Sequence, residues 1–478
     1  MKNILFLICI LFATLSNAQN LSELLGNTQK GHKISGEIKN MQDTTVILAY
    51  YFGGKQYVTD TAVVTNGKFT FSGDKQLDGG IYLIILPGGK YFELIISEQK
   101  FSFTTDINNL VASMKFNNSR ENDAFYTYLN FITSQQQKVA PLKERLANAQ
   151  ENEKKKIQEE ISEVDNLVRD YRDDFQSKYK DVFFSKIISA TTDIVIPETP
   201  LDSTGKPKEN FPFYYYKKHF WDNMDFSDNK MLRTPIFFNK MDQYLEKFSP
   251  KHPDSIIVSA DILIEKAKAN KEIFKYVVSY ITSTYERSKI MGMDAVFVHM
   301  VEKYYMTGQC DWVKEKQLNK IIERASRISP NMIGKKPPNL VFKDTSNQYH
   351  SLYHLEAEYT LLYFYDPDCG HCKKETPKVK AVCDSLMGAG IDIKVFAVTT
   401  EFDIEKWKEF IRKYNTGNWI NVGDIQFDKE GNPVATSNWR EQYDIYSTPV
   451  IYLLNKDKEI IAKRINDKQI VKIIQREE

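Results

Sequence analysis

Hydrophobic and polar residues alternate along the first part of the chain. Between residues 33 and 106 the sequence contains short runs such as KISGEI, TVILAYY and KFTFSG, in which roughly every second position is apolar. Alternation with a period of two, rich in β-branched and aromatic residues, predicts β-strands. Asn66-Gly67 separates two of these runs, and this dipeptide is typical of a two-residue hairpin because both positions accept positive φ. We therefore expect an all-β sandwich over residues 30–118.

The hydrophobic period becomes helical between residues 120 and 328. Its clearest example is a stripe of six residues spaced four and three apart, namely Ile157, Ile161, Val164, Val168, Tyr171 and Phe175. This spacing places all six side chains on one face of a helix. The stripe is shorter than the three heptads typical of a coiled coil, which favours a helical hairpin within the chain over a dimerisation seam. We expect an all-α domain over residues 120–328.

The last part of the chain has a third pattern. Prolines and a glycine in SPNMIGKKPPNLVF mark a boundary at residues 329–342. Beyond it, the continuous apolar runs TLLYFY, IDIKVFAV and PVIYLL alternate with helical segments. Strands that are buried on both faces and separated by helices predict an α/β layer fold. We expect this third domain over residues 333–478.

Charge and the N-terminal residues narrow the range of partners and compartments. The chain has 478 residues with 64 basic and 63 acidic side chains, so no net field favours a nucleic acid or an anionic membrane. Residues 1–18 combine Lys2, an apolar run from Ile4 to Leu15 and a small-residue end at Ala18, which predicts a secretory signal peptide cleaved after Ala18. The run is too short to span a membrane, which takes about 20 residues. We therefore expect a periplasmic or otherwise exported protein without a stable membrane span.

Two of the cysteines form a Cys-Gly-His-Cys motif directly after an apolar strand and at the start of a helix. In this position, unpaired backbone N–H groups and the helix dipole stabilise a thiolate at Cys369. Cys372 lies nearly one helical turn further on, where its sulfur can close a disulfide with Cys369. His371 can carry positive charge near neutral pH and would stabilise the thiolate further. We predict Cys369, Cys372 and His371 as catalytic residues, with the Cys369–Cys372 disulfide as redox group and no other cofactor.

Other roles for the cysteines stay open. A purely structural Cys369–Cys372 bridge would close a very small loop and stabilise the fold little. A zinc site would need a fourth ligand beyond Cys369, His371 and Cys372, and the sequence has no second Cys-x-x-Cys pair. Cys383 is expected to be an inert apolar thiol, although a bridge to Cys310 is compatible with the sequence. We predict no metal site.

The same residues carry a family resemblance. The segments IGKKPPN, LLYFYDPDCGHC, KKETP and STPVIYLL resemble the TlpA/ResA-like thiol–disulfide oxidoreductases, which implies a thioredoxin-like fold for the C-terminal domain. The resemblance also implies that Thr448-Pro449 is a cis-proline loop whose backbone binds the substrate. The upstream parts resemble the β and helical domains of unknown function that precede such modules in exported Bacteroidota proteins.

The chain departs from the thioredoxin pattern next to the motif. Asp368 stands where many thioredoxins have a tryptophan, and its negative charge would oppose thiolate formation. Tyr363 replaces a buried aspartate, so no proton acceptor is expected there. Glu375 is expected to be a solvated helix residue.

The resemblance implies an enzyme that exchanges disulfides with protein thiols, as a reductase or isomerase in cell-envelope redox homeostasis. A reductase would be fed by a membrane electron donor. One alternative is a binding or scaffold protein in which the β and helical domains carry the function and the thiol site is vestigial. Another is a thiol peroxidase, although Asp366 occupies the position where such enzymes have Thr or Ser.

Overall fold

The computed structural model describes residues 31–430 and 432–477. The chain divides into two compact units, one up to Tyr244 and one from Leu245 onwards, and each is described by itself. The predicted signal peptide, residues 1–18, lies outside the described residues. The boundaries expected for the three domains stay a prediction.

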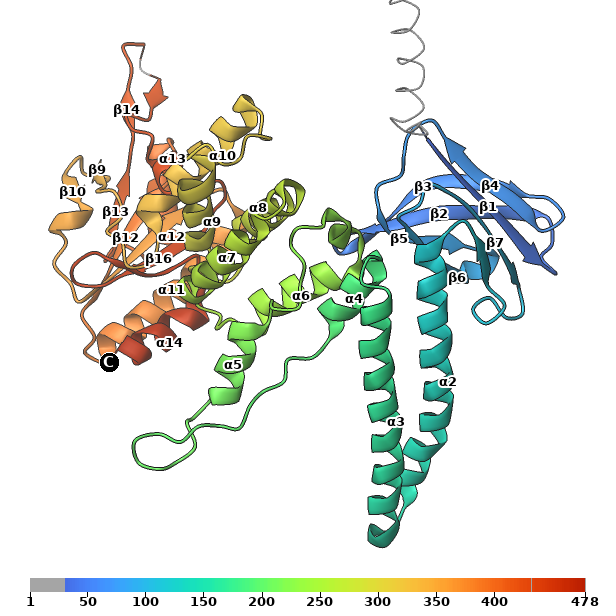
Figure 1. Ribbon diagram of the computed structural model, residues 1–478. Helices are drawn as coiled ribbons and strands as arrows, with labels where there is room; N and C mark the ends of the chain where they lie inside the picture. The colour runs from blue at the N-terminus through green and yellow to red at the C-terminus, as the bar shows by residue number, and fades with distance from the viewer. Residues whose placement is uncertain (1–30, 431, 478) are drawn as a thin grey trace, which may run out of the picture. The chain divides into compact units, whose positions relative to one another are not determined.

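The first unit begins with two four-stranded sheets (Figure 1). One sheet has the order β4-β1-β7-β8 and the other β3-β2-β5-β6. The strands are β1 (His32–Lys39), β2 (Thr44–Phe52), β3 (Lys55–Val64), β4 (Lys68–Gly73), β5 (Gly80–Ile85), β6 (Tyr91–Ile96), β7 (Lys100–Asp106) and β8 (Lys115–Asn117). β1 and β7 are parallel, whereas the other pairs are antiparallel.

The two sheets pack face to face through their buried side chains, which alternate with less buried ones along β1 and β4. The ring of Phe92 on β6 meets the ring of Phe103 on β7 edge to face at 5.6 Å, which joins the two sheets. Asn66 and Gly67 between β3 and β4 have φ of 51° and 74°. These values confirm the expected hairpin turn, and the predicted all-β sandwich is confirmed.

A long helical hairpin follows the sandwich (Figure 1). It consists of α2 (Arg120–Asn148) and α3 (Glu151–Lys178), and α2 begins with Ser119 accepting a hydrogen bond from the backbone of Asn122. Tyr171 from the apolar stripe stacks on Phe131 of α2 at 3.6 Å between ring centroids. The stripe therefore packs within the chain, as the hairpin interpretation predicts.

Further helices complete the α-helical part. They are α4 (Phe183–Thr191), α5 (Phe211–His219), the 3₁₀ helix η2 (Asn229–Arg233), α6 (Pro235–Glu246), α7 (Pro253–Ala267), α8 (Lys271–Glu286), α9 (Asp294–Met300) and α10 (Glu315–Ile328). A π-helical turn at Val301–Tyr305 extends α9, and Gly308 follows it with φ of 77°. The central helical region is therefore confirmed.

The second unit ends in a seven-stranded mixed sheet with the order β10-β9-β13-β12-β11-β16-β17. The strands are β9 (Val341–Lys343), β10 (Tyr349–Ser351), β11 (Tyr359–Tyr365), β12 (Ile393–Thr399), β13 (Ile420–Gly423), β16 (Val450–Leu454) and β17 (Ile460–Lys463). All seven residues of the central strand β11 are buried. β11 runs parallel to β12 and antiparallel to β16.

Helices cover both faces of this sheet (Figure 1). The core on one face takes its side chains from α11 (Gly370–Gly388), α12 (Ile404–Lys413) and α14 (Asp467–Glu477). The core on the other face includes Trp439 and Tyr443 from α13 (Trp439–Gln442) and the residue after it. This arrangement confirms the predicted α/β layer fold. The periodicity did not predict β13, α13 or the small β14–β15 hairpin (Gln426–Phe427 and Pro433–Val434), because each is too short to show a period.

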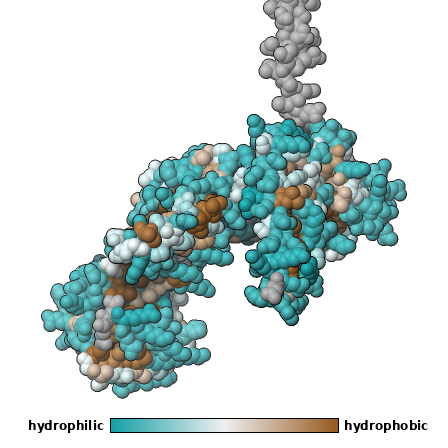
Figure 2. Space-filling view, turned by 60° about the horizontal axis from the view of Figure 1, so that its bottom comes forward, coloured by the Kyte–Doolittle hydropathy of each residue, from teal (hydrophilic) through white to brown (hydrophobic). Residues whose placement is uncertain are grey.

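One face of the molecule is mainly hydrophilic. On the face shown in Figure 2, hydrophilic residues cover most of the surface and apolar residues form small groups. Within residues 31–430 and 432–477, no helix combines the length and the apolar composition needed to cross a membrane.

Candidate active site

The cysteine motif lies at the junction of β11 and α11. β11 ends at Tyr365, and the chain turns through residues 366–368 before Cys369 caps the N-terminus of α11. The Asp366 carboxylate accepts the backbone N–H of Asp368 at 2.8 Å, and the Asp366 carbonyl accepts that of Cys369 at 3.1 Å. These bonds fix the turn, so that Cys369 meets the unpaired N–H groups of the first helical turn.

The two sulfurs differ in their access to solvent. Cys369 is partly exposed, and its thiol donates a hydrogen bond of 3.4 Å to the carbonyl oxygen of Thr448. Cys372 is completely buried, and its sulfur accepts the backbone N–H of Asp366 at 3.4 Å. Both thiols are free, so the structure presents the dithiol form. Only Cys369 can meet a large substrate directly.

The environment moves the pKa values of the two thiols in opposite directions. Burial opposes ionisation of Cys369, but hydrogen bonds from the backbone and thiol of Cys372, the Thr448 side chain and the His371 backbone outweigh it. The pKa of Cys369 therefore lies below its ordinary value. Burial and the neighbouring Cys369 together raise the pKa of Cys372 to about 12. The structure thus provides one ionisable thiol beside one that keeps its proton.

The Thr448-Pro449 peptide bond is cis, as the family resemblance implies. It lies just before β16, which pairs with β11 in the sheet. Through this pairing, Thr448 reaches Cys369 although the two residues are 79 positions apart in the sequence. The structure therefore brings together three of the predicted positions, Cys369, Cys372 and Thr448.

The side chain of His371 is exposed at the start of α11. The contribution that the structure shows from this residue to Cys369 is a hydrogen bond from its backbone N–H. A role for the imidazole stays a prediction.

Asp368 is paired with a lysine that the sequence analysis did not single out. Its carboxylate lies 2.9 Å from the ammonium group of Lys406 on α12, which also lies 3.8 Å from Glu401. The pKa of Asp368 is lowered by its hydrogen bond and charge interaction with Lys406. The lysine thus offsets the negative charge that Asp368 places next to the thiol. No local pattern could reveal this pair, because its members are 38 residues apart.

Buried hydroxyl groups lie on β11 and α11, the two elements that flank the cysteine motif. Tyr363 and Thr376 share a hydrogen bond of 2.8 Å, and the ring of Tyr363 stacks on Tyr365 at 5.5 Å. The Tyr365 hydroxyl accepts the indole N–H of Trp407 at 2.8 Å. Burial raises the pKa of both tyrosines. The Tyr363 hydroxyl therefore keeps its proton and does not act as a proton acceptor at ordinary pH.

Glu375 differs from the expectation of a solvated side chain, which was wrong. Its side chain is only 19% exposed and lies 3.2 Å from Lys378. The other carboxylate oxygen accepts the backbone N–H of Asp467 at 3.3 Å, at the start of α14. The reason is tertiary, because α14 packs beside α11 and offers its unpaired N-terminal N–H groups.

The remaining cysteines are distant from solvent. Cys310 and Cys383 are both buried and both free, so the structure shows no bridge between them. Burial raises the pKa of each thiol to about 12. Within the described part of the chain, no group of three His, Cys, Asp or Glu side chains is placed to hold a metal ion.

Two parts of the chain match known domains whose function is unknown. Residues 32–125 match the domain DUF4369, and residues 143–329 match the domain DUF5106. No curated protein matches the chain at a significant level.

Several solved structures are similar to parts of the chain. A domain of a possible thiol-disulfide isomerase from Cytophaga hutchinsonii has 38% sequence identity and a TM-score of 0.27, and the match covers 31% of this chain and 95% of that one. A thioredoxin-like protein from Bacteroides caccae has 20% identity and a TM-score of 0.43, covering 60% and 100%. The thioredoxin domain of a thiol-disulfide oxidoreductase from Bacteroides vulgatus has 22% identity and a TM-score of 0.26, covering 30% and 96%.

The C-terminal part of the chain has a family match of its own. Residues 333–463 match the AhpC/TSA family, and this range contains β9 to β17 and both cysteines of the motif. The match confirms the expected thioredoxin-like character of this part. The C-terminal region of the chain is therefore a thioredoxin-like domain of the AhpC/TSA family.

Proposed function

We propose that the chain is an exported thiol–disulfide oxidoreductase that exchanges disulfides with protein substrates through Cys369 and Cys372. The observation that carries the proposal is the contrast between the two thiols. Cys369 is partly exposed with a lowered pKa, whereas Cys372 is fully buried with a raised one. The thiolate is the species that attacks a disulfide, so this contrast gives each cysteine a separate role.

The reaction proceeds through a mixed disulfide. The Cys369 thiolate attacks one sulfur of the substrate disulfide, the substrate S–S bond breaks, and the other substrate sulfur leaves as a thiolate that takes a proton from water. Cys372 then attacks the Cys369 sulfur, the mixed disulfide bond breaks, and the second substrate sulfur leaves and takes up the proton that Cys372 has lost. The substrate has gained two electrons, and the enzyme pair has become the Cys369–Cys372 disulfide.

The environment of Cys372 favours this order of events. Its proton is held by burial and also by the hydrogen bond and negative charge of Cys369. When Cys369 becomes part of a mixed disulfide, its negative charge disappears, and this contribution to the raised pKa is lost. Cys372 is therefore easier to ionise at the step in which it must attack.

The cis-proline loop would bind the substrate. The backbone of Thr448 lies against Cys369, so an extended substrate segment that pairs with this backbone would bring its sulfur toward the Cys369 thiolate. We assign Thr448 and Pro449 to substrate binding. The cysteine disulfide is then the only redox group that the reaction needs.

Reduction of insulin disulfides tests the activity. Wild type should reduce insulin in the presence of a small thiol, Cys369→Ser should lose the activity, and Cys383→Ser should keep it because that thiol is buried away from substrate. Equal rates for wild type and Cys369→Ser would remove the enzyme assignment. The β and helical parts would then carry the function, as in a binding or scaffold protein.

Equilibration in glutathione buffers tests the direction of exchange. We propose a reductase or isomerase in cell-envelope redox homeostasis, with a membrane electron donor restoring the dithiol in the reductase case. A potential below about −250 mV would exclude an oxidase, whereas one above about −200 mV would contradict a reductase and favour an isomerase or oxidase.

The peroxidase alternative lacks a hydroxyl group at the expected position. The carboxylate of Asp366 already accepts the backbone N–H of Asp368 and cannot donate a hydrogen bond to a peroxide while it is ionised. Consumption of hydrogen peroxide should therefore be slow compared with insulin reduction. Peroxide consumption that is faster and depends on Cys369 would favour the peroxidase.

A further inference from the structure

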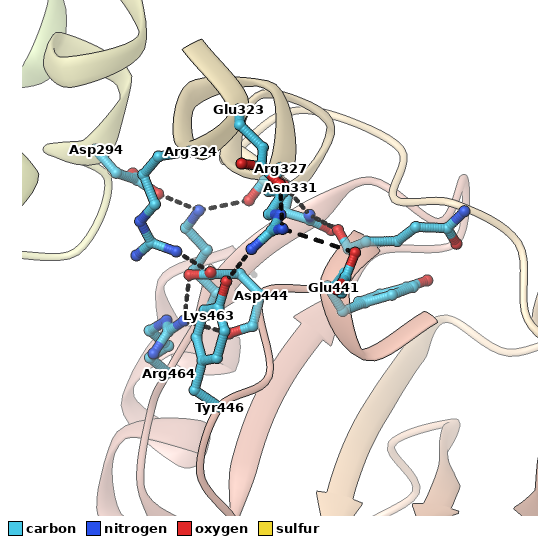
Figure 3. Close-up of polar contacts among 12 residues, drawn as sticks. Asp294, Glu323, Arg324, Arg327, Asn331, Glu441, Asp444, Tyr446, Lys463 and Arg464 are labelled. Atoms are coloured by element: carbon cyan, nitrogen blue, oxygen red, sulfur yellow. Dashed lines mark hydrogen bonds and ion pairs between the residues drawn. The ribbon is translucent and has the colours of Figure 1, made fainter. Parts of the chain in front are cut away.

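Helix α10 holds the chain just ahead of the cis-proline loop. Figure 3 shows Arg324 and Arg327 of α10 reaching toward Asp444 and Tyr446, which belong to the stretch of residues 443–449, called here the loop segment. Arg324 forms an ion pair with Asp444, and Arg327 donates a hydrogen bond of 2.5 Å to the Tyr446 hydroxyl. The Arg324 guanidinium also lies over the Tyr446 ring, 5.6 Å from its centroid.

Hydrogen bonds and ion pairs hold Asp444, and with it the loop segment, in place. It is only 5% exposed, and its second carboxylate oxygen accepts a hydrogen bond of 2.8 Å from Arg464. Arg464 also donates to the backbone carbonyl of Asp444 at 2.8 Å. A buried carboxylate requires such partners, and two planar guanidinium groups define its orientation. The backbone of Asp444 has a φ of 56°, so these contacts fix the loop segment where the chain reverses.

A second set of contacts joins the end of α10 to the same region (Figure 3). Asn331, which is 1% exposed, donates from its side-chain amide to the backbone carbonyl of Gln442. The carbonyl of Asn331 accepts a hydrogen bond from Lys463 of β17, and this buried lysine pairs with Asp294 of α9. Gln442, just before the loop segment, and Lys463 on β17 are therefore held by residues that precede the thioredoxin-like part.

The loop segment ends at the thiol site. Tyr446 is two residues before Thr448, whose carbonyl oxygen is 3.4 Å from the Cys369 sulfur. We propose that α10 is a positioning element of the thiol site, in which Arg324 and Arg327 fix the loop segment and thereby hold Thr448 against Cys369. The proposal rests on the function proposed above and adds a partner within the chain. It gives the last helix of the DUF5106 match a role in disulfide exchange.

Loss of the α10 contacts should change both the binding of the protein substrate and the ionisation of the Cys369 thiol. A loop segment that moves more freely presents a less defined backbone to the substrate, which raises KM for a protein disulfide. It also disturbs the contact between the Cys369 thiol and the Thr448 carbonyl, so the ionisation of Cys369 at a given pH changes. A helix that only stabilises the fold would change neither quantity in protein that remains folded.

Three variants of the full chain separate the possibilities. Arg324→Gln with Arg327→Gln removes both contacts, and Tyr446→Phe removes the Arg327 hydrogen bond without changing any charge. The control is Arg412→Gln, because Arg412 is an exposed arginine on α12. Circular dichroism checks folding, insulin reduction gives kcat and KM, and alkylation with iodoacetamide at several pH values gives the ionisation of Cys369.

The double variant should lower kcat/KM for insulin roughly tenfold, mainly through KM, and should shift the alkylation profile of Cys369 away from that of wild type. Tyr446→Phe should show the same changes in smaller size, and Arg412→Gln none. Folded double and Tyr446→Phe variants with wild-type KM and a wild-type alkylation profile would overturn the proposal. If the double variant does not fold, Tyr446→Phe decides alone, since its ring is 65% exposed.

The alkylation profile also keeps this proposal separate from the proposed function. If wild-type protein fails to reduce insulin, the proposed function fails, but the profiles of wild type and variants still show whether α10 affects Cys369. If wild type reduces insulin and all variants behave like it, the proposed function stands and the role of α10 is rejected.

Discussion

The sulfur of Cys369 lies 3.4 Å from the carbonyl oxygen of Thr448, so the N-terminus of α11 and the cis-proline loop are in direct contact. The thiol is positioned from two sides. The helix supplies N–H groups that favour its ionisation, and the loop supplies the backbone against which a substrate can lie. The following predictions test this arrangement.

Replacement of Cys372 should trap the intermediate. In Cys372→Ser the mixed disulfide between Cys369 and a substrate protein forms but cannot be resolved, because no second thiolate is within reach. Incubation with a disulfide-containing protein should therefore give a covalent complex that a reducing agent dissolves and that mass spectrometry assigns to Cys369. Cys369→Ser should give no such complex. A complex through Cys372 in that variant would contradict the assigned roles.

The ion pair next to the motif should tune the thiol in two directions. Lys406→Gln leaves Asp368 unpaired, so its negative charge disfavours the thiolate and slows alkylation of Cys369 at pH 7. Asp368→Asn removes the negative charge and leaves Lys406, so alkylation should become faster. Each change should be modest, about two- to fivefold, because the pair is exposed to solvent. Changes of the same sign in both variants would show that charge is not the cause.

Tyr363 should matter for stability and little for the reaction. Tyr363→Phe removes the hydrogen bond with the buried Thr376 and should lower the free energy of unfolding by about 1–3 kcal/mol, as expected for a buried polar group left without its partner. Insulin reduction should stay within about twofold of wild type, because the raised pKa of the hydroxyl excludes proton exchange at ordinary pH. Thr376→Val in the same background should restore part of the stability. A large loss of activity at unchanged stability would instead give the hydroxyl a role in proton transfer.

Local sequence was sufficient for the elements that depend on local chemistry. Asn66-Gly67 predicted a hairpin because few residues accept two consecutive positive φ values, and the fully apolar TLLYFY predicted the central strand. β13 was not predicted, since its four residues INVG form a strand through their pairing with β12 and β9. Its stability is tertiary, and no period can show it.

The candidate site likewise contains some features that local sequence predicts and others that depend on tertiary contacts. Cys369 and Cys372 are close in sequence, and their setting between strand and helix predicted Cys369 as the attacking thiol, which is the more exposed of the two in the structure. The pairing of Asp368 with Lys406 and the burial of Glu375 against α14 depend on helices that come later in the chain. The contacts of α10 with Asp444 and Tyr446 join residues that are 120 and 119 positions apart in the sequence. Such contacts follow from the packing of helices, which sequence patterns do not specify.

The most direct test is the pH dependence of alkylation at each cysteine of the reduced protein, measured by peptide mass spectrometry after short pulses of iodoacetamide. A lowered pKa means that the thiolate is present at lower pH, so Cys369 should reach half of its maximal rate below the value of about 8.5 for a free cysteine. Cys372 should react slowly throughout, because its pKa is raised to about 12 and its sulfur is buried. If Cys369 instead ionises at or above the pH of a free cysteine, or if Cys372 is labelled first, the assignment of Cys369 as the attacking thiolate is wrong.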